Sequence, residues 1–152
     1  MLIAYYYASK FTYRSVGPAG KLHNVVAHIH GSNQRYHHFV AIALRSIPMD
    51  NETRWNSWYR MIIVGLQLRA AITQYQEDFY SEFDHEDLLN PADWKALADA
   101  RDFLQPFDRV TKETEGDNST LDQVLYTMDF LVHHFKASEV YIVYPKSILY
   151  IC

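Results

Sequence analysis

Apolar residues recur at helical spacing along most of the chain, and these repeats predict a mainly α-helical protein. The first repeat follows a Gly-Pro-Ala-Gly turn that starts at Gly17, and it stops at Gly31. A second repeat starts after Ser32 or Asn33, either of which can cap a helix. We expect a helical hairpin whose apolar positions are Leu22, Val25, Val26, Ile29, Tyr36, Phe39, Val40, Ala43 and Leu44.

A longer amphipathic helix is predicted from Asn56 to about Phe79, over about six turns. An acidic segment, residues 80–90, follows it and is typical of a solvated loop. The long helix has an apolar and a polar face. The apolar face carries Tyr59, Ile62, Ile63, Leu66, Ala70 and Thr73, and the polar face carries Arg60, Gln67, Arg69 and Gln76.

Two more helices are predicted after the acidic segment. Asn90-Pro91 has the cap residue and the first-turn proline of a helix start, and Pro106 should kink or break that helix near Asp102. The most regular apolar stripe of the chain lies between Leu121 and Phe135. We therefore divide the chain into an unassigned segment 1–16, a helical domain 17–136 and an aberrant, apolar, β-prone tail 137–152.

Composition and charge set limits on the class of protein. A chain of 152 residues with 49% hydrophobic and 21% charged residues suits one globular domain. Net charge is −4 and the isoelectric point is about 6.0, so a nucleic-acid surface would have to be a local patch. No run approaches the ~20 apolar residues of a membrane span. We expect neither secretion nor membrane insertion, and a nuclear or cytoplasmic location.

Cysteine and histidine patterns do not predict a metal site. The single cysteine, Cys152, excludes an intramolecular disulfide and a cysteine-based zinc cluster. His28-x-His30 and His37-His38 do not place two imidazoles one helical turn apart, as a helical metal pair requires. A distant partner for His133 or His134 stays open. The basic or titratable outer face expected of the hairpin consists of Lys21, His23, His28, His30, Arg35, His37 and His38.

The polar turn from Asp50 to Tyr59 carries the clearest candidate chemistry. Asn56 or Ser57 can cap the helix that follows, so Arg54 and Trp55 stand just before a helix start. An arginine fork binds phosphate and a tryptophan ring stacks on an unpaired base. The alternative is a tryptophan that plugs the core beside a solvated arginine, and these residue types alone leave both open.

Four separated blocks, spread over roughly residues 14 to 136, carry a family resemblance. The blocks are Gly17-Pro18-x-Gly20-Lys21-Leu22-His23-Asn24; Ser32-x-Gln34-Arg35 with Phe39; Asp50-x-x-Thr53-Arg54-Trp55-Asn56-Ser57-x-Tyr59-x-Met61; and Leu89-x-x-x-Asp93-Trp94 with Leu104-x-Pro106-Phe107 and Thr111. In order and spacing they resemble the hAT superfamily of DNA transposases, of the Activator/hobo group and its fungal type.

The resemblance implies a fold and a role. In this family an RNase H-like domain holds divalent metal such as Mg through Asp, Asp and Glu, and a helical insertion carries the Arg-Trp motif that contacts DNA. This chain lacks the segments that bear those acids, and Asp50 is not one of them. We therefore expect a helical bundle, the insertion-domain fragment of a transposase, without catalytic residues, cofactor or cleavage activity alone. The implied DNA contacts are Arg54, Trp55, Asn56, Lys21 and Arg35.

Implied partners are transposon-end DNA, a second copy of the chain or a full-length transposase. Two alternatives from other classes stay open. One is a non-catalytic protein-interaction module that docks a partner through the apolar helix 119–136. The other is a pseudogene product without function. An intact enzyme is least favoured, because the sequence has no glycine-rich phosphate loop, nucleophile elbow or His-x-x-x-His motif.

Overall fold

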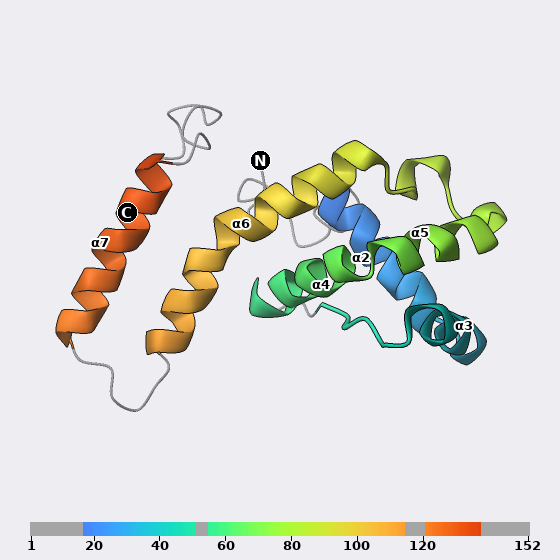
Figure 1. Cartoon of the computed structure of the whole chain (residues 1–152), viewed down its shortest axis with the longest axis horizontal. Helices are drawn as coiled ribbons and strands as arrows, with labels where there is room; N and C mark the ends of the chain where they lie inside the picture. Colours follow the sequence, from blue (N-terminus) through green and yellow to red (C-terminus); the bar gives the residue numbers. More distant parts are fainter. Residues whose placement is uncertain (1–16, 51–54, 115–120, 138–152) are drawn as a thin grey trace. The chain divides into compact units, whose positions relative to one another are not determined.

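A computed structural model describes residues 17–50, 55–114 and 121–137. These residues form six α-helices and two short 3-10 helices, and none of them lies in a strand (Figure 1). The predicted mainly α-helical class is confirmed. The predicted segment 1–16 and the tail beyond Ala137 lie outside the described residues. With the labels of Figure 1 the elements are α2 (Gly17–His30), α3 (Asn33–Ala43), α4 (Trp55–Gln67), α5 (Arg69–Asp78), η1 (Tyr80–Glu82), η2 (His85–Asp87), α6 (Pro91–Thr114) and α7 (Leu121–Ala137).

The chain divides into two compact units, Leu2–Arg101 and Asp102–Cys152, with Met1 in the second. In the first unit α2 packs against α3, α4 and η2. The four apolar positions expected of α2 are all fully buried, as its helical repeat predicts. The core of this unit is built around them and consists of Leu22, Val25, Val26, Ile29, Phe39, Ile47, Met61, Ile62, Val64, Ile72, Tyr75, Trp94 and Leu97.

The hairpin of α2 and α3 forms as its turn residues predict. Gly17 begins α2 with φ of 81°, a conformation that glycine adopts without a steric cost. Gly31 ends the helix, and its amide bonds to the carbonyl of Ala27. At the far end of α3, Leu44 takes a left-handed conformation with φ of 54°. Only Phe39 of α3 is fully buried, and its ring meets Tyr75 edge-on at 5.7 Å.

The prediction of a single long helix from residue 56 to 79 is wrong, because the helix is interrupted at Leu68. Ala70 and Thr73, expected on its apolar face, are exposed. Helix α4 ends at Gln67 and α5 starts at Arg69, while the amide of Leu68 still bonds to Val64. Gln76 was expected on the polar face, but it is buried. Its side chain bonds to backbone groups at residues 87 and 89 across the acidic segment. Long-range contacts therefore overrode the local pattern.

The acidic segment is more ordered than a solvated loop, since it contains η1 and η2. The Asn90-Pro91 helix start is confirmed. The side-chain carbonyl of Asn90 accepts bonds from the amides of Ala92 and Asp93 at 2.8 and 3.0 Å, and the Asp93 carboxylate accepts the Asn90 amide at 3.0 Å. This reciprocal pattern is a capping box, and it fixes where α6 begins.

The second unit contains the end of α6 and all of α7. Helix α6 continues through Pro106 to Thr114, so of the kink or break predicted near Asp102 the break does not occur. One proline removes a single helical hydrogen bond and leaves the bonds on either side in place. The imidazole of His134 donates to the carbonyl of Phe103 at 3.0 Å, and the rings of Phe103 and Phe107 both meet Phe135 nearly perpendicularly.

The outward side of α7 differs from the expected stripe. Leu125, Met128 and Val132, which the helical repeat placed on the apolar side, are 58%, 60% and 48% exposed. Tyr126 and Phe130 are exposed as well. Packing on α6 therefore uses only part of the apolar surface of α7.

Candidate nucleic-acid interface

The candidate site lies where the chain enters α4. Trp55 is the first residue of α4, so Asn56 and Ser57 lie inside the helix and the prediction that one of them caps it is wrong. Asp50 is the last described residue before α4. Arg54 lies outside the described residues. No acidic side chain occupies the first turn of α4, so the free amides and the positive end of the helix dipole face no carboxylate from that turn.

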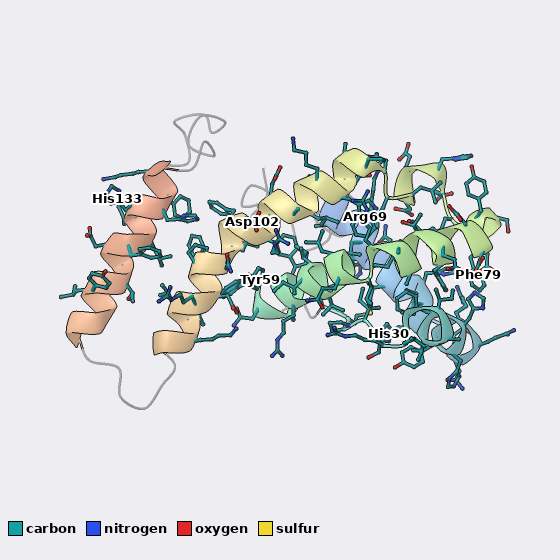
Figure 2. The ribbon with its side chains drawn as sticks, in the orientation of Figure 1. His30, Tyr59, Arg69, Phe79, Asp102 and His133 are labelled. Carbon is teal, nitrogen blue, oxygen red and sulfur yellow. The ribbon has the colours of Figure 1, made fainter. Side chains whose placement is uncertain are left out.

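Trp55 is neither fully buried nor free. It is partly buried, and its ring lies 6.0 Å from that of Tyr59 with an interplanar angle of 38°. Tyr59, labelled in Figure 2, is buried on α4 one turn further on. Because residues four apart share a helix face, Trp55 lies on the same face of α4 as the buried Tyr59, at the N-terminal end of the helix. The indole thus has an aromatic neighbour in Tyr59, and the residue as a whole is partly buried.

Three buried side-chain atoms near this helix start have no hydrogen-bond partner among the described residues. They are Oδ2 of Asp50, Oδ1 of Asn56 and Nε1 of Trp58. Leaving such a group unpaired costs about 1–3 kcal/mol. Asn56, predicted to contact DNA, is thus partly buried with its carbonyl oxygen turned inward.

Asp50 forms a buried hydrogen bond with His23 that the sequence did not indicate. Its carboxylate lies 2.5 Å from Nδ1 of His23, and both residues are 6% exposed. A carboxylate only accepts, so His23 carries the proton on Nδ1. The expectation that His23 belongs to an outer basic face is wrong. The one feature of the sequence that could have indicated its burial is that His23 directly follows Leu22, a core residue of α2.

Lys21 and Arg35 are both engaged with carboxylates. The Lys21 ammonium lies 2.9 Å from the Asp93 carboxylate and donates to the carbonyl of Leu88 at 3.3 Å. Arg35 lies 3.5 Å from Glu82. The Lys21 side chain is 22% exposed, so it is much less available to a phosphate than a solvated lysine. Each of these two predicted DNA contacts therefore already has a carboxylate partner among the described residues.

A histidine network connects α2 with α5 and η1. The Glu82 carboxylate accepts the Nε2 proton of His28 at 3.0 Å, so Nδ1 accepts the hydroxyl proton of Tyr75 at 2.9 Å. Burial lowers the pKa of His28, against the raising effect of its bond to Glu82. Burial also raises the pKa of Tyr75 to about 12, which keeps the phenol a donor. The network favours neutral His28 and serves packing.

Metal chemistry finds no support in the described ranges. Within residues 17–50, 55–114 and 121–137 no three His, Cys, Asp or Glu side chains gather closely enough to hold a metal ion. His134, whose partner had been left open, bonds to a backbone carbonyl. None of the helices in these ranges has the length and apolar character needed to cross a bilayer.

The family of the chain follows from a family-model comparison. The model of the ZBED1 RNase-like helical domain matches residues 16–103, more than half of the chain. The chain belongs to this family, a hAT-related transposase-like domain. The matched range ends two residues beyond Arg101, where the first compact unit ends. Searches of curated proteins and of solved structures found no match.

Proposed function

We propose that this chain is a hAT-type transposase fragment of the fungal type that does not cleave DNA alone and contacts DNA through Arg54 and Trp55. The observation that carries the proposal is the partly buried Trp55 ring at the first residue of α4. A helical family domain related to hAT transposases supports the context. Nuclear localisation would follow from such a role.

The chemistry of the helix start suits an unpaired base at a DNA end. An indole that is held on one side by Tyr59 loses little freedom when a base stacks on its accessible part. The arginine before it and the helix amides favour a phosphate oxygen. Cleavage needs carboxylates that converge on metal ions, and the proposal assigns none here.

The experiment measures binding of the purified chain to a short duplex with one unpaired terminal base, over a salt series. Trp55→Ala should lose about tenfold or more in affinity, and Trp55→Phe should keep most of it, since base stacking contributes about 1–3 kcal/mol. Arg54→Ala should reduce the salt slope by about one. Arg60→Ala, an exposed arginine of α4, is the matched control and should leave both unchanged.

Circular dichroism and urea unfolding establish that each variant keeps its fold. Wild-type chain that does not bind, or Trp55→Ala that binds like wild type, would overturn the DNA-contact role. Lys21→Met and Arg35→Met belong in the same series. If either predicted contact is made, its salt slope falls; their existing ion pairs lead us to expect a smaller change than for Arg54.

Self-association is a second candidate function, and the exposed side of α7 favours it. Leu125, Met128 and Val132 form one exposed stripe, with Tyr126 and Phe130 on the other side of the helix. The stripe is an apolar surface that a second copy of the chain can cover, and because only three side chains face that way, the expected contact is a small one that depends on concentration.

Sedimentation over a range of concentrations tests this second function. Met128→Glu with Val132→Glu should turn a concentration-dependent dimer into a monomer, because an unpaired charge inside an interface is costly. His133→Glu, at an exposed position of the same helix, is the matched control. Wild-type chain that remains monomeric at every concentration, or a double variant that still dimerises, would rule it out.

A further inference from the structure

Two histidines of α2 hold the chain segment that leads to α4. His30 Nε2 donates to the carbonyl of Ile47 at 2.9 Å, and His23 Nδ1 bonds to the Asp50 carboxylate. The stretch from Ile47 to Asp50 is neither helix nor strand, so it has no regular backbone ladder of its own. The two histidine hydrogen bonds hold this stretch in place of a backbone ladder.

The two contacts match in spacing. His23 and His30 are seven residues apart on α2, which corresponds to two turns and a rise of about 10.5 Å on one helix face. Ile47 and Asp50 are three residues apart, which spans about 10 Å of extended chain. The lower-numbered histidine binds the higher-numbered residue, so the segment runs antiparallel to α2.

The anchored segment is also fixed from the inside. Ile47 is 1% exposed in the core, and the Asp50 side chain is fully shielded. Helices α2 and α4 also pack closely through Leu22 and Gly65. Segment 47–50 and α4 are thereby held on the same helix, and four residues, 51–54, lie between Asp50 and Trp55 in the sequence.

We propose that His23 and His30 are positioning residues, which clip segment 47–50 along α2 and thereby set the approach of the chain to Trp55 for DNA contact. This role rests on the proposed function. Neither histidine touches DNA, so both act through the orientation of the chain at the start of α4. The buried pair with Asp50 is the stronger anchor, because a buried charged group without its partner is costly.

The variants distinguish the loss of the N–H donor from the loss of the imidazole ring. His23→Leu removes the donor, whereas His23→Asn keeps an N–H close to the place of Nδ1. His30→Leu removes the second donor, and His30→Gln keeps an N–H close to the place of Nε2. Asp50→Asn is a further variant with minimal change of volume, for use if His23→Leu does not fold.

Affinity for the duplex with an unpaired terminal base is measured for each variant in the wild-type and Trp55→Ala backgrounds. His23→Leu should weaken binding about tenfold and His30→Leu somewhat less, with recovery in His23→Asn and His30→Gln. In the Trp55→Ala background the same changes should have little further effect, because the contact that they position is gone. Purely structural roles would produce equal losses in both backgrounds and would overturn the proposal.

The outcomes for the two proposals are distinguishable. If Trp55→Ala loses affinity while both leucine variants bind like wild type, the positioning role fails and the DNA contact stands. If the wild-type chain does not bind, or Trp55→Ala binds like wild type, the DNA contact fails and the positioning role with it. Hydrogen exchange at the amides of Met49 and Asp50 then still reports whether the clip exists: it should accelerate in both leucine variants and not in the rescue variants.

Discussion

Replacement of Gly65 by alanine tests the close packing of α4 on α2. A Cβ at this position would lie 2.9 Å from Cδ2 and 3.1 Å from Cδ1 of Leu22, closer than such atoms approach without a shift. Leu22 is fully buried, so its side chain has no solvent into which it can move. The glycine is therefore required by tertiary contact and not by its own backbone conformation.

Two opposed effects decide the sign of the change. Alanine in a helix interior is favoured over glycine by about 1 kcal/mol. Overpacking of a filled core costs about 1–3 kcal/mol. We expect Gly65→Ala to lower the free energy of unfolding by about 1 kcal/mol. In a Leu22→Ala background, which itself costs about 2–5 kcal/mol, the clash is absent and the same change should raise it by about 1 kcal/mol.

Urea unfolding, followed by the helical circular dichroism signal, gives the free energy of unfolding of the wild type, Gly65→Ala, Leu22→Ala and the double variant. Ala70→Gly, at an exposed position of α5, measures the propensity difference alone in this chain. A coupling of about 2 kcal/mol between Gly65 and Leu22 is expected. A gain of about 1 kcal/mol from Gly65→Ala in the wild-type background would refute the reasoning.

Three further changes follow from single features of the fold. Leu44 has a left-handed backbone conformation and is 88% exposed, so Leu44→Gly should raise the free energy of unfolding by about 1 kcal/mol. Leu44→Ala should change the free energy of unfolding little, and urea unfolding measures both. Burial lowers the pKa of His28 below 6.5, so the unfolded chain binds the proton more readily than the folded chain. The free energy of unfolding should therefore rise with pH between the lowered pKa and about 6.5. His28→Gln should flatten this slope in unfolding measurements over a pH series. Lys21→Met should lower stability by about 1–3 kcal/mol, because it leaves the Asp93 carboxylate, 12% exposed, without its cation, and Asp93→Asn in the same background should restore part of the loss.

The helical class and the element starts could be predicted from local sequence. The apolar repeat of α2 identifies four core residues, and Asn90-Pro91 marks the start of α6 by its cap chemistry. Both signals act over a few residues, and the tertiary structure leaves both intact. The family resemblance likewise rests on short blocks, and the family match over residues 16–103 confirms it at the level of a hAT-related domain.

The candidate site could be predicted only in part. The pattern located Arg54 and Trp55 beside a helix start, and Trp55 does begin α4. It left open whether that ring is core or platform, since the answer depends on what packs against its two faces. Partial burial against Tyr59 is a property of the assembled first unit. Lys21 and Arg35 looked like free cations because their carboxylate partners are distant in sequence.

The sequence by itself therefore determined the helical class, where α6 begins and which four residues of α2 form its apolar stripe, because these depend on neighbours within a turn or two. Only the tertiary structure decided the pairs between distant segments. His23 and Asp50 are 27 residues apart, and Lys21 and Asp93 are 72 apart. No local period encodes such a pair, since its energy exists only once the helices bring both groups out of water together.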